Sequence, residues 1–228
     1  MTALLLRCAG PMQSWGIQSR FDIRDTGREP SKSGIIGLVC AALGRPRSAP
    51  IADLAGLRMG VRVEKEGRVA QDYHTVGGGY RTARPPIQAP LKATGQPNYN
   101  AVVSRRYYLA DADFIVGLAG DAALLQQVQD ALTNPQWPLC LGRRAFPPSE
   151  PVCTEEGLQP GRTLEEALRD PPVTMVKSAP GQTRRLMLED PAGDIVRYDQ
   201  PISFADRTFR ARYLVAAQVT VGPAPEGE

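Results

Sequence analysis

Short apolar runs, separated by polar segments rich in glycine and proline, define the elements that this chain is expected to form. Apolar or alternating runs of about four to eight residues predict strands, and apolar residues at helical spacing predict helices. The strands expected in the first part of the chain are 3–8, 57–63, 68–75, 105–109, 114–118 and 139–141. The helices expected there are 34–43 and 122–132.

Residues that favour helix ends flank both expected helices. Ser31 or Ser33 can cap the first helix and Gly44 can close it, while Asp121 can cap the second. The resulting order is strand, helix, strand, long excursion, strand, helix, strand. This is the βαββαβ order of the ferredoxin-like or RNA-recognition-motif fold. We therefore expect an α+β, ferredoxin-like domain over residues 1–145.

The composition changes after residue 148, where prolines repeatedly interrupt the chain. A short helix is expected at 164–169, and strand-like runs are expected at 173–177, 184–188 and 212–221. We therefore expect residues 146–228 to form a small β-rich C-terminal domain.

One stretch departs from the rest of the chain in its charge. Tyr73 to Ala110 contains no Asp or Glu, although the chain carries 24 acidic residues, and five of the 7 tyrosines lie within it. Aromatic rings beside arginines on an irregular backbone suit single-stranded nucleic acid, whose bases stack and whose phosphates need cations. The insertion from about 76 to 104 exceeds an ordinary connection, which indicates either a function or an exposed loop without one.

Length, hydrophobic content and net charge limit the functions that are possible. With 228 residues and 42% hydrophobic content, the chain can bury a substantial core. The net charge of +3 does not by itself indicate a polyanion partner, so a nucleic-acid hypothesis depends on where the charge lies. The N-terminal apolar run, Leu4 to Leu6, is too short for a signal sequence or a membrane span. We expect a cytoplasmic protein without a membrane partner.

Several residues are candidates for contact with RNA. Trp15 could stack a base while Gln13 reads its edge, although a Trp near a strand end also suits a lid on the core. Arg28 and Lys32 precede and begin the first helix, where free N–H groups could hold a phosphate; ordinary capping is the alternative. The other candidates are aromatic or basic: Tyr73, His74, Tyr80, Arg81, Arg84, Arg105, Arg106, Arg143 and Arg144.

The residue types that catalysis most often requires are sparse. His74 is the single histidine, and the cysteines show no Cys-x-x-Cys pairing, so we expect no metal site, no cofactor and reduced, packed thiols. One enzymatic possibility remains, which is metal-independent RNA cleavage. In that reaction His74 or a tyrosine would take the proton from a 2′-hydroxyl and a cation would stabilise the phosphorane. A lone histidine at a strand end also fits a structural or binding role.

Five segments together resemble a known family. They are LLLRCAGPMQSWG at 4–16, PSKSGIIGL at 30–38, DYHTV at 72–76, RYYL at 106–109 and LGRR at 141–144. Their order and spacing resemble the CasD family, whose members are subunits of the type I-E CRISPR Cascade complex and belong to the RAMP superfamily. The similarity covers most of residues 1–145.

This resemblance implies a noncatalytic protein of antiviral defence that caps the 5′ handle of CRISPR RNA. It implies contacts with the backbone and large subunits of Cascade, and with target DNA through the complex. A thumb hairpin is expected at 76–104. The handle is expected to pass over the loop at Gln13 and Trp15, the helix start at Arg28 and Lys32, and the turn at 142–144.

Two other functions stay open at this point. The first is a CRISPR RNA-processing endonuclease, because relatives in another type I subtype cut the precursor RNA themselves. The second is a protein-interaction module that makes no RNA contact and whose basic loop binds an acidic partner. Incubation with repeat RNA in EDTA tests the first, and the absorbance ratio of the purified complex before and after nuclease tests the second.

Overall fold

The computed structural model describes residues 1–17, 22–77, 91–92, 94–176 and 181–221. Its larger sheet has seven strands in the order β10-β11-β9-β4-β7-β1-β8, and every pairing in it is antiparallel. The strands are β1 (Thr2–Ala9), β4 (Arg58–Lys65), β7 (Asp113–Ala119), β8 (Leu158–Pro160), β9 (Thr183–Glu189), β10 (Ile195–Ser203) and β11 (Thr208–Thr220).

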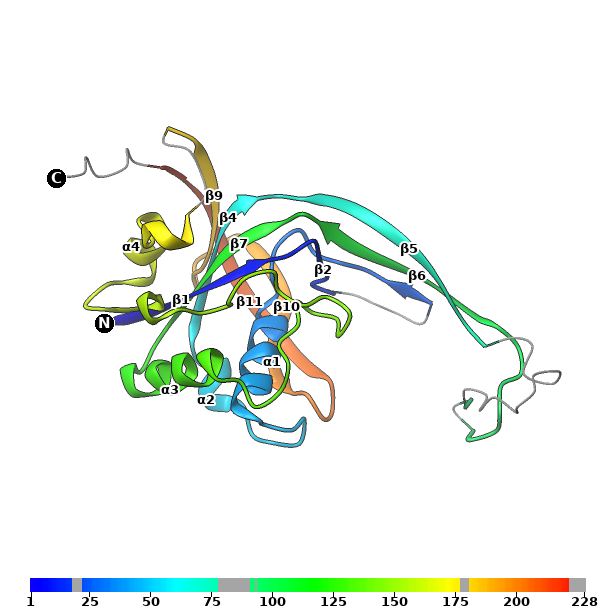
Figure 1. The fold of residues 1–228 in the computed structure, drawn as a ribbon. Coiled ribbons are helices and arrows are strands. Elements are labelled where there is room, and N and C mark those ends of the chain that lie inside the picture. Colours follow the sequence, from blue (N-terminus) through cyan, green and yellow to red (C-terminus); the bar gives the residue numbers. More distant parts are fainter. Residues whose placement is uncertain (18–21, 78–90, 93, 177–180, 222–228) are drawn as a thin grey trace.

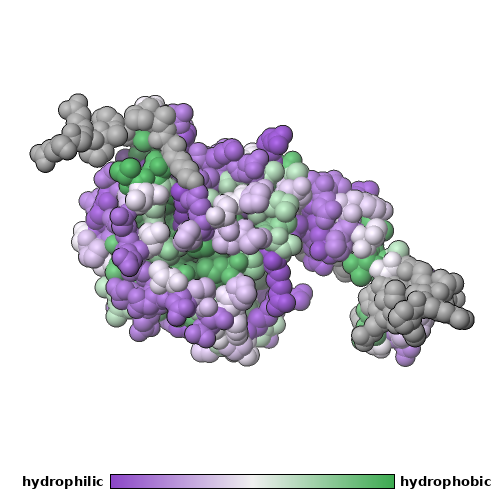
Figure 2. All heavy atoms as spheres, in the orientation of Figure 1, coloured by the Kyte–Doolittle hydropathy of each residue, from purple (hydrophilic) through white to green (hydrophobic). Residues whose placement is uncertain are grey.

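A second sheet forms a long arm that leaves the body of the molecule (Figure 1). It contains β2 (Met12–Gln13), β3 (Ile23–Arg24), β5 (Arg68–Val76) and β6 (Val102–Ala110). β6 lies at its centre and pairs with β5, β2 and β3. β5 follows β4 through Gly67, which has a φ of 70°. The middle of the arm is hydrophilic, and apolar side chains gather toward its far end (Figure 2).

The larger sheet is covered on both faces, which explains why residues 3–6 of β1 are all apolar. Leu4 and Leu6 of β1 pack in a cluster with α1 (Lys32–Leu43), α2 (Ala52–Ala55) and α3 (Ala122–Thr133). Ala3 and Leu5 point to the opposite face and pack beneath α4 (Leu164–Arg169). Successive side chains of a strand alternate between faces, so two apolar layers need a continuous apolar run. The architecture is a mixed α+β fold with antiparallel sheets.

The predicted helix ends are confirmed by the capping geometry. The Ser31 side chain accepts a hydrogen bond from the Gly34 amide at the start of α1. Gly44 ends α1 in the left-handed region, with a φ of 69°. Asp121 caps α3 by accepting from the Leu124 amide.

Two predicted strands are wrong. Residues 139–141 form no strand. The Leu141 carbonyl accepts a hydrogen bond from the Ser14 amide, and the Leu141 amide donates to the Phe146 carbonyl, so its two backbone bonds go to different segments and form no ladder. Gly142, which follows with a φ of 89°, turns the chain away. The outer neighbour of β1 is instead β8. Residues 173–175 form a 3-10 turn where a strand was predicted at 173–177, and β10 was not predicted at all.

The strands of the C-terminal part extend the same sheet as the first part. β9 pairs with β4 from Gly60↔Leu188 to Val63↔Arg185, and β11 and β10 follow outward.

The predicted boundary between 1–145 and 146–228 stays a prediction. The predicted thumb at 76–104 falls partly on 78–90 and 93, outside the described residues. None of the described helices combines the length and the apolar character needed to cross a membrane.

Candidate nucleic-acid interface

The middle of the arm carries a concentration of arginines. Strand register places Arg105 of β6 opposite Tyr73 of β5, and places Arg106 opposite Asp72. On the other side of β6, Arg24 of β3 lies beside Arg106. Tyr73 is 62% exposed, so its ring is available for stacking next to a guanidinium group.

Arg143 joins this cluster from a separate loop. Its Nη2 donates to the carbonyls of Arg24 (3.2 Å) and Tyr107 (2.9 Å), and its guanidinium lies 5.6 Å from the ring centroid of Phe146. Burial and the neighbouring charge of Arg106 lower the pKa of the Arg143 guanidinium below its ordinary value. An arginine stays protonated even so, and the shared repulsion favours an anion at this place.

The loop can approach the arm this closely because of Gly142. A Cβ at Gly142 would lie 1.8 Å from the Ser14 carbonyl oxygen, so no larger residue fits there. The glycine therefore sets the position of Arg143. Arg144, the next residue, is exposed, as is Arg28. Within the part of the chain that the structure describes, neither Arg144 nor Arg105 forms an ion pair.

His74 lies on the exposed ribbon without a second catalytic group close by, among the described residues, that could act with it. Its Nδ1 is 3.8 Å from Oδ2 of Asp72, a separation too long for a hydrogen bond. The described residues contain no group of three or more His, Cys, Asp or Glu side chains able to hold a metal ion. Tyr80, Arg81 and Arg84, also predicted to bind RNA, lie outside the described residues.

Gln13 and Trp15 are buried, which gives no support to the predicted base contact. The Gln13 amide donates to the carbonyls of Cys8 and Ala112, at 2.8 Å each. The Trp15 indole, 1% exposed, donates to Oε1 of Gln13 at 3.1 Å. A base could reach neither side chain without opening this packing. In the described arrangement Trp15 is the core lid that the sequence left as an alternative, and the Gln13 side chain accepts its indole hydrogen bond.

Lys32 is also buried, and the predicted phosphate position at the start of α1 is already filled. Lys32 Nζ lies 3.0 and 2.9 Å from the two carboxylate oxygens of Glu189. The Lys32 amide donates to Oδ2 of Asp199 at 2.8 Å, and Arg212 donates to the same carboxylate at 2.6 and 2.9 Å. This buried ion cluster ties α1 to β9, β10 and β11 and gives Lys32 a structural role.

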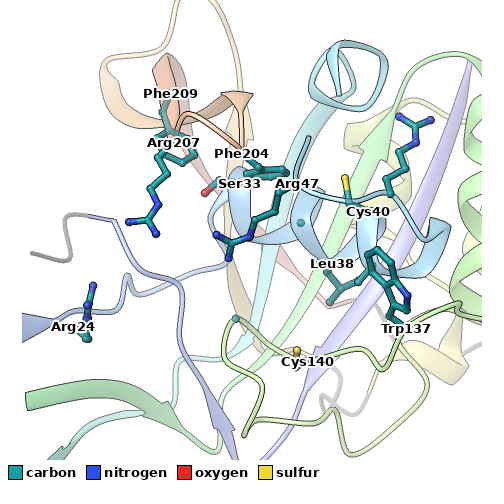
Figure 3. Close-up of a pocket in the computed structure, with 15 residues that line it drawn as sticks. Arg24, Ser33, Leu38, Cys40, Arg47, Trp137, Cys140, Phe204, Arg207 and Phe209 are labelled. Carbon is teal, nitrogen blue, oxygen red and sulfur yellow. The ribbon is translucent and has the colours of Figure 1, made fainter. Parts of the chain in front are cut away.

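A hollow of about 590 Å³ lies beside α1, next to the arginine cluster (Figure 3). We call it the α1 pocket and define it by six of its lining residues, Arg24, Gly37, Arg47, Trp137, Phe204 and Arg207. None of the described residues that line it is acidic. Apart from Arg24, which lies at the edge of the arm, these residues come from α1, the loop after it, the loop before Gly142 and the β10–β11 turn.

The α1 pocket was not predicted from the sequence, because its residues are scattered along the chain. Two local signals were present. Gly34, Gly37 and Ala41 recur at helical spacing on α1, which indicates a helix face without bulk. Arg207 occupies a hairpin turn with a φ of 55°, where glycine is usual. Neither signal shows which distant residues would close the hollow.

Comparisons with known proteins agree on one group. The profile of the family described as CRISPR-associated protein (Cas_Cas5) matches residues 3–215. The CRISPR system Cascade subunit CasD of Escherichia coli (strain K12) is 32% identical over 163 residues, covering 65% of this chain and 68% of the relative.

Two solved structures are similar along nearly the whole chain. A crystal structure of a Cas protein is 37% identical, with a TM-score of 0.75, and covers 98% of this chain and 100% of that one. A chain of a CRISPR RNA-guided surveillance complex is 35% identical, with a TM-score of 0.76, and covers 98% of this chain and 95% of that one.

Proposed function

The chain belongs to the CRISPR-associated Cas5 family, and we propose that it is a noncatalytic subunit of a Cascade-type surveillance complex. In this role it binds CRISPR RNA and caps the 5′ handle of that RNA. Two relatives support the assignment to a complex: one is a Cascade subunit and one is a chain of an RNA-guided surveillance complex.

The strand order supports a ferredoxin-like body. Four neighbouring strands of the larger sheet lie in the spatial order β8-β1-β7-β4, and α1 and α3 cover one face of them. Along the chain these elements follow one another as β1-α1-β4-β7-α3-β8. This is the βαββαβ order, with β8 as the last strand. The β5–β6 ribbon is inserted between the second and third strands of that order, which is where the family's thumb hairpin is expected.

The observation that carries the RNA-binding role is the arginine cluster in the middle of the arm. Arg24, Arg106 and Arg143 converge from three separate segments, and Arg105, the preceding residue of β6, lies beside the exposed Tyr73 ring on the opposite face of the ribbon. Cations beside a stacking surface match the needs of single-stranded RNA. Guanidinium groups spread over the middle of β6, β3 and a neighbouring loop suit phosphates more than base edges, so we propose that these arginines hold the RNA backbone.

The noncatalytic part of the proposal rests on His74. General base catalysis needs a base within hydrogen-bond reach of the proton and an orienting partner, and the 3.8 Å separation from Asp72 on an open ribbon supplies neither. The endonuclease function that the sequence left open therefore gains no support from the described residues.

The partners proposed for the arm are the other Cascade subunits. Val76, Val102 and Val103 are exposed near the far end of the ribbon, where a two-stranded element has no core in which to bury them. We infer that a backbone subunit covers them and that target DNA is reached through the complex. The proposal includes a cytoplasmic location, in keeping with the four free thiols.

The proposal is tested by charge reversal in an assembled complex. A complex carrying Arg105→Glu and Arg106→Glu should retain far less CRISPR RNA than the wild type, and it should lose all RNA sequences alike. Arg169→Glu, which reverses an exposed arginine at the end of α4 on the opposite face of the sheet, is the matched control. Equal RNA retention by the double variant and the control would remove the arginine cluster from the function.

A further inference from the structure

The arm joins the body through a bend in one pair of strands (Figure 1). β4 of the body continues into β5 of the arm through residues 66–67, and β6 of the arm returns into β7 of the body through residues 111–112. Each connection contains a left-handed residue, Gly67 with a φ of 70° and Asp111 with a φ of 55°. The pairing of β4 with β7 also shifts register just before the bend. Because bulges and left-handed residues bend a strand pair, this bend sets the angle between the arm and the body.

One guanidinium group of the body reaches the bend. Arg185 of β9 lies opposite Val63 of β4 in the strand register. Its Nε and Nη2 donate to the two carboxylate oxygens of Glu66, at 3.1 Å each. Glu66 immediately precedes Gly67, and a two-pronged contact between arginine and carboxylate fixes orientation as well as distance. Arg185 therefore ties the turn between β4 and β5 to the neighbouring strand β9.

The same guanidinium group holds a second connection between the arm and the body. β3 of the arm leads into α1 of the body through residues 25–31, and Glu29 lies on this segment. Nη1 and Nη2 of Arg185 donate to Oε2 of Glu29 at 3.2 Å each, and Nη2 of Arg197, on β10, donates to Oε1 at 3.3 Å. Arg185 thus contacts both a segment that enters the arm and a segment that leaves it.

This ion cluster differs from an isolated surface pair. The Glu29 side chain is only 10% exposed, so its charge depends on Arg185 and Arg197 more than on water. Burial opposes the charge of Arg185, but Glu66 and Glu29 outweigh it and raise the pKa of the guanidinium above its ordinary value. Isolated exposed pairs contribute little to stability, whereas networks of charges hold a defined geometry.

We propose that Arg185 is a positioning residue that fixes the angle of the arm to the body through Glu66 and Glu29. Its consequence for RNA rests on the proposed function. The arginine cluster combines Arg24 and Arg106 of the arm with Arg143 of the body, so a change of angle at the bend moves the first two relative to the third. Arg185 itself contacts carboxylates and no RNA.

The cluster can be opened without removing a core residue. Arg185→Gln removes the cation, while Glu29 retains Arg197 and Glu66 is half-exposed to water. Arg185→Lys keeps the charge but lacks the planar fork that serves two carboxylates at once. Arg210→Gln is the matched control, because it makes the same charge change at an exposed arginine of β11 that forms no ion pair within the described residues.

The angle is measured on the free, full chain as the distance between two nitroxide labels. The labels are attached at Thr75→Cys, on the arm, and at Gln127→Cys, on α3, both exposed positions. Cys140→Ser removes the half-exposed native thiol, and the other cysteines are buried. The labelled parent and its Arg210→Gln variant should give the same narrow distance distribution.

Loss of the Arg185 cation should broaden that distribution. We expect a broader distribution for Arg185→Gln and an intermediate one for Arg185→Lys. The contacts of Arg143 with the arm remain in both variants, so the arm should stay attached and sample several angles. Adding Glu66→Gln to Arg185→Gln should change nothing further, because the two residues act through the same contact.

RNA retention by assembled complexes tests the consequence of the angle. Arg185→Gln should lower retention by roughly two- to fivefold, the effect expected for a surface ion pair. The log–log salt slope of RNA binding should stay unchanged, because no phosphate contact is lost. A direct phosphate contact would instead flatten the slope by about 0.7.

The outcomes separate this inference from the proposed function. If Arg185→Gln gives the same distance distribution as Arg210→Gln, the positioning role is overturned, whatever the RNA result. If the distribution broadens and RNA retention equals that of the wild type, Arg185 fixes the angle but the consequence for RNA is wrong. A flattened salt slope would make Arg185 an RNA contact and contradict the proposal. If the wild-type complex retains no RNA, the proposed function fails, and the distances still decide the angle.

Discussion

Replacement of Asp199 by alanine should unfold the protein more easily without a direct effect on RNA. Asp199 is 4% exposed, and its carboxylate accepts from the Lys32 amide and from two nitrogens of Arg212. Removing one partner of a buried pair typically costs about 3 to 5 kcal/mol, because the other charge is left uncompensated.

The local structure places the expected value at the lower end of that range. Glu189 lies 3.9 Å from Arg212 and would retain part of the charge compensation. We therefore expect a loss of about 3 kcal/mol in the free energy of unfolding of Asp199→Ala. For a chain of this size the loss corresponds to a fall in melting temperature of roughly 6 to 12 °C. Asp199→Asn, which keeps one acceptor, should lie between this variant and the wild type.

Urea denaturation of the free chain measures the stability, and RNA retention by the assembled complex measures function under conditions where the variant is folded. Two results together would refute the reasoning. They are a loss below about 1 kcal/mol in the free energy of unfolding of Asp199→Ala, and tighter RNA binding by Asp199→Asn than by the wild type. That result would mean that the carboxylate competes with an RNA phosphate for the start of α1. The buried ion cluster would then be a closed phosphate site instead of a structural link.

Three further predictions concern the arm and the cysteines. Alanine replacement of both Arg105 and Arg106 should flatten the log–log salt dependence of RNA binding by about 0.7 for each phosphate that the arginines no longer neutralise, and an unchanged slope would make them structural. His74→Ala should not change any RNA processing in EDTA; a fall of about 10² to 10⁴ in rate would reveal catalysis. Iodoacetamide at pH 8, followed by mass spectrometry, should label the half-exposed Cys140 before Cys153, because burial raises the pKa of Cys153 to about 12 and suppresses its thiolate. RNA loading should protect Cys140, which lines the α1 pocket, and faster labelling of Cys153 would contradict the described packing.

The sequence predicted elements well where local pattern and local capping determine them. The strands β1, β4, β5, β6 and β7 and the helices α1 and α3 fall where apolar periodicity and end residues indicated. The predictions were wrong where pairing is decided at long range. Leu141 is buried and apolar, as a strand residue would be, but Gly142 must turn beneath the Ser14 carbonyl, so the segment cannot continue as a ladder.

The candidate site was predictable only in part, for a related reason. The charge imbalance of 73–110 is a property of one stretch, so Arg105, Arg106 and the adjacent Tyr73 could be singled out from the sequence. Burial depends on distant partners. Nothing near Lys32 in the sequence indicates that its ammonium group pairs with the carboxylate of Glu189, 157 residues away. The α1 pocket likewise needs residues from both halves of the chain.

The most direct test of the central claim is to co-express the tagged chain with a CRISPR array and the other Cascade subunits, and to identify the RNA and proteins that purify with it. We predict that CRISPR RNA with an intact repeat-derived 5′ end and the other subunits will co-purify with the wild type. We also predict that the Arg105→Glu, Arg106→Glu variant will lose the RNA while remaining folded. Recovery of the other subunits without CRISPR RNA, or of RNA in equal amount with the variant, would contradict the assignment.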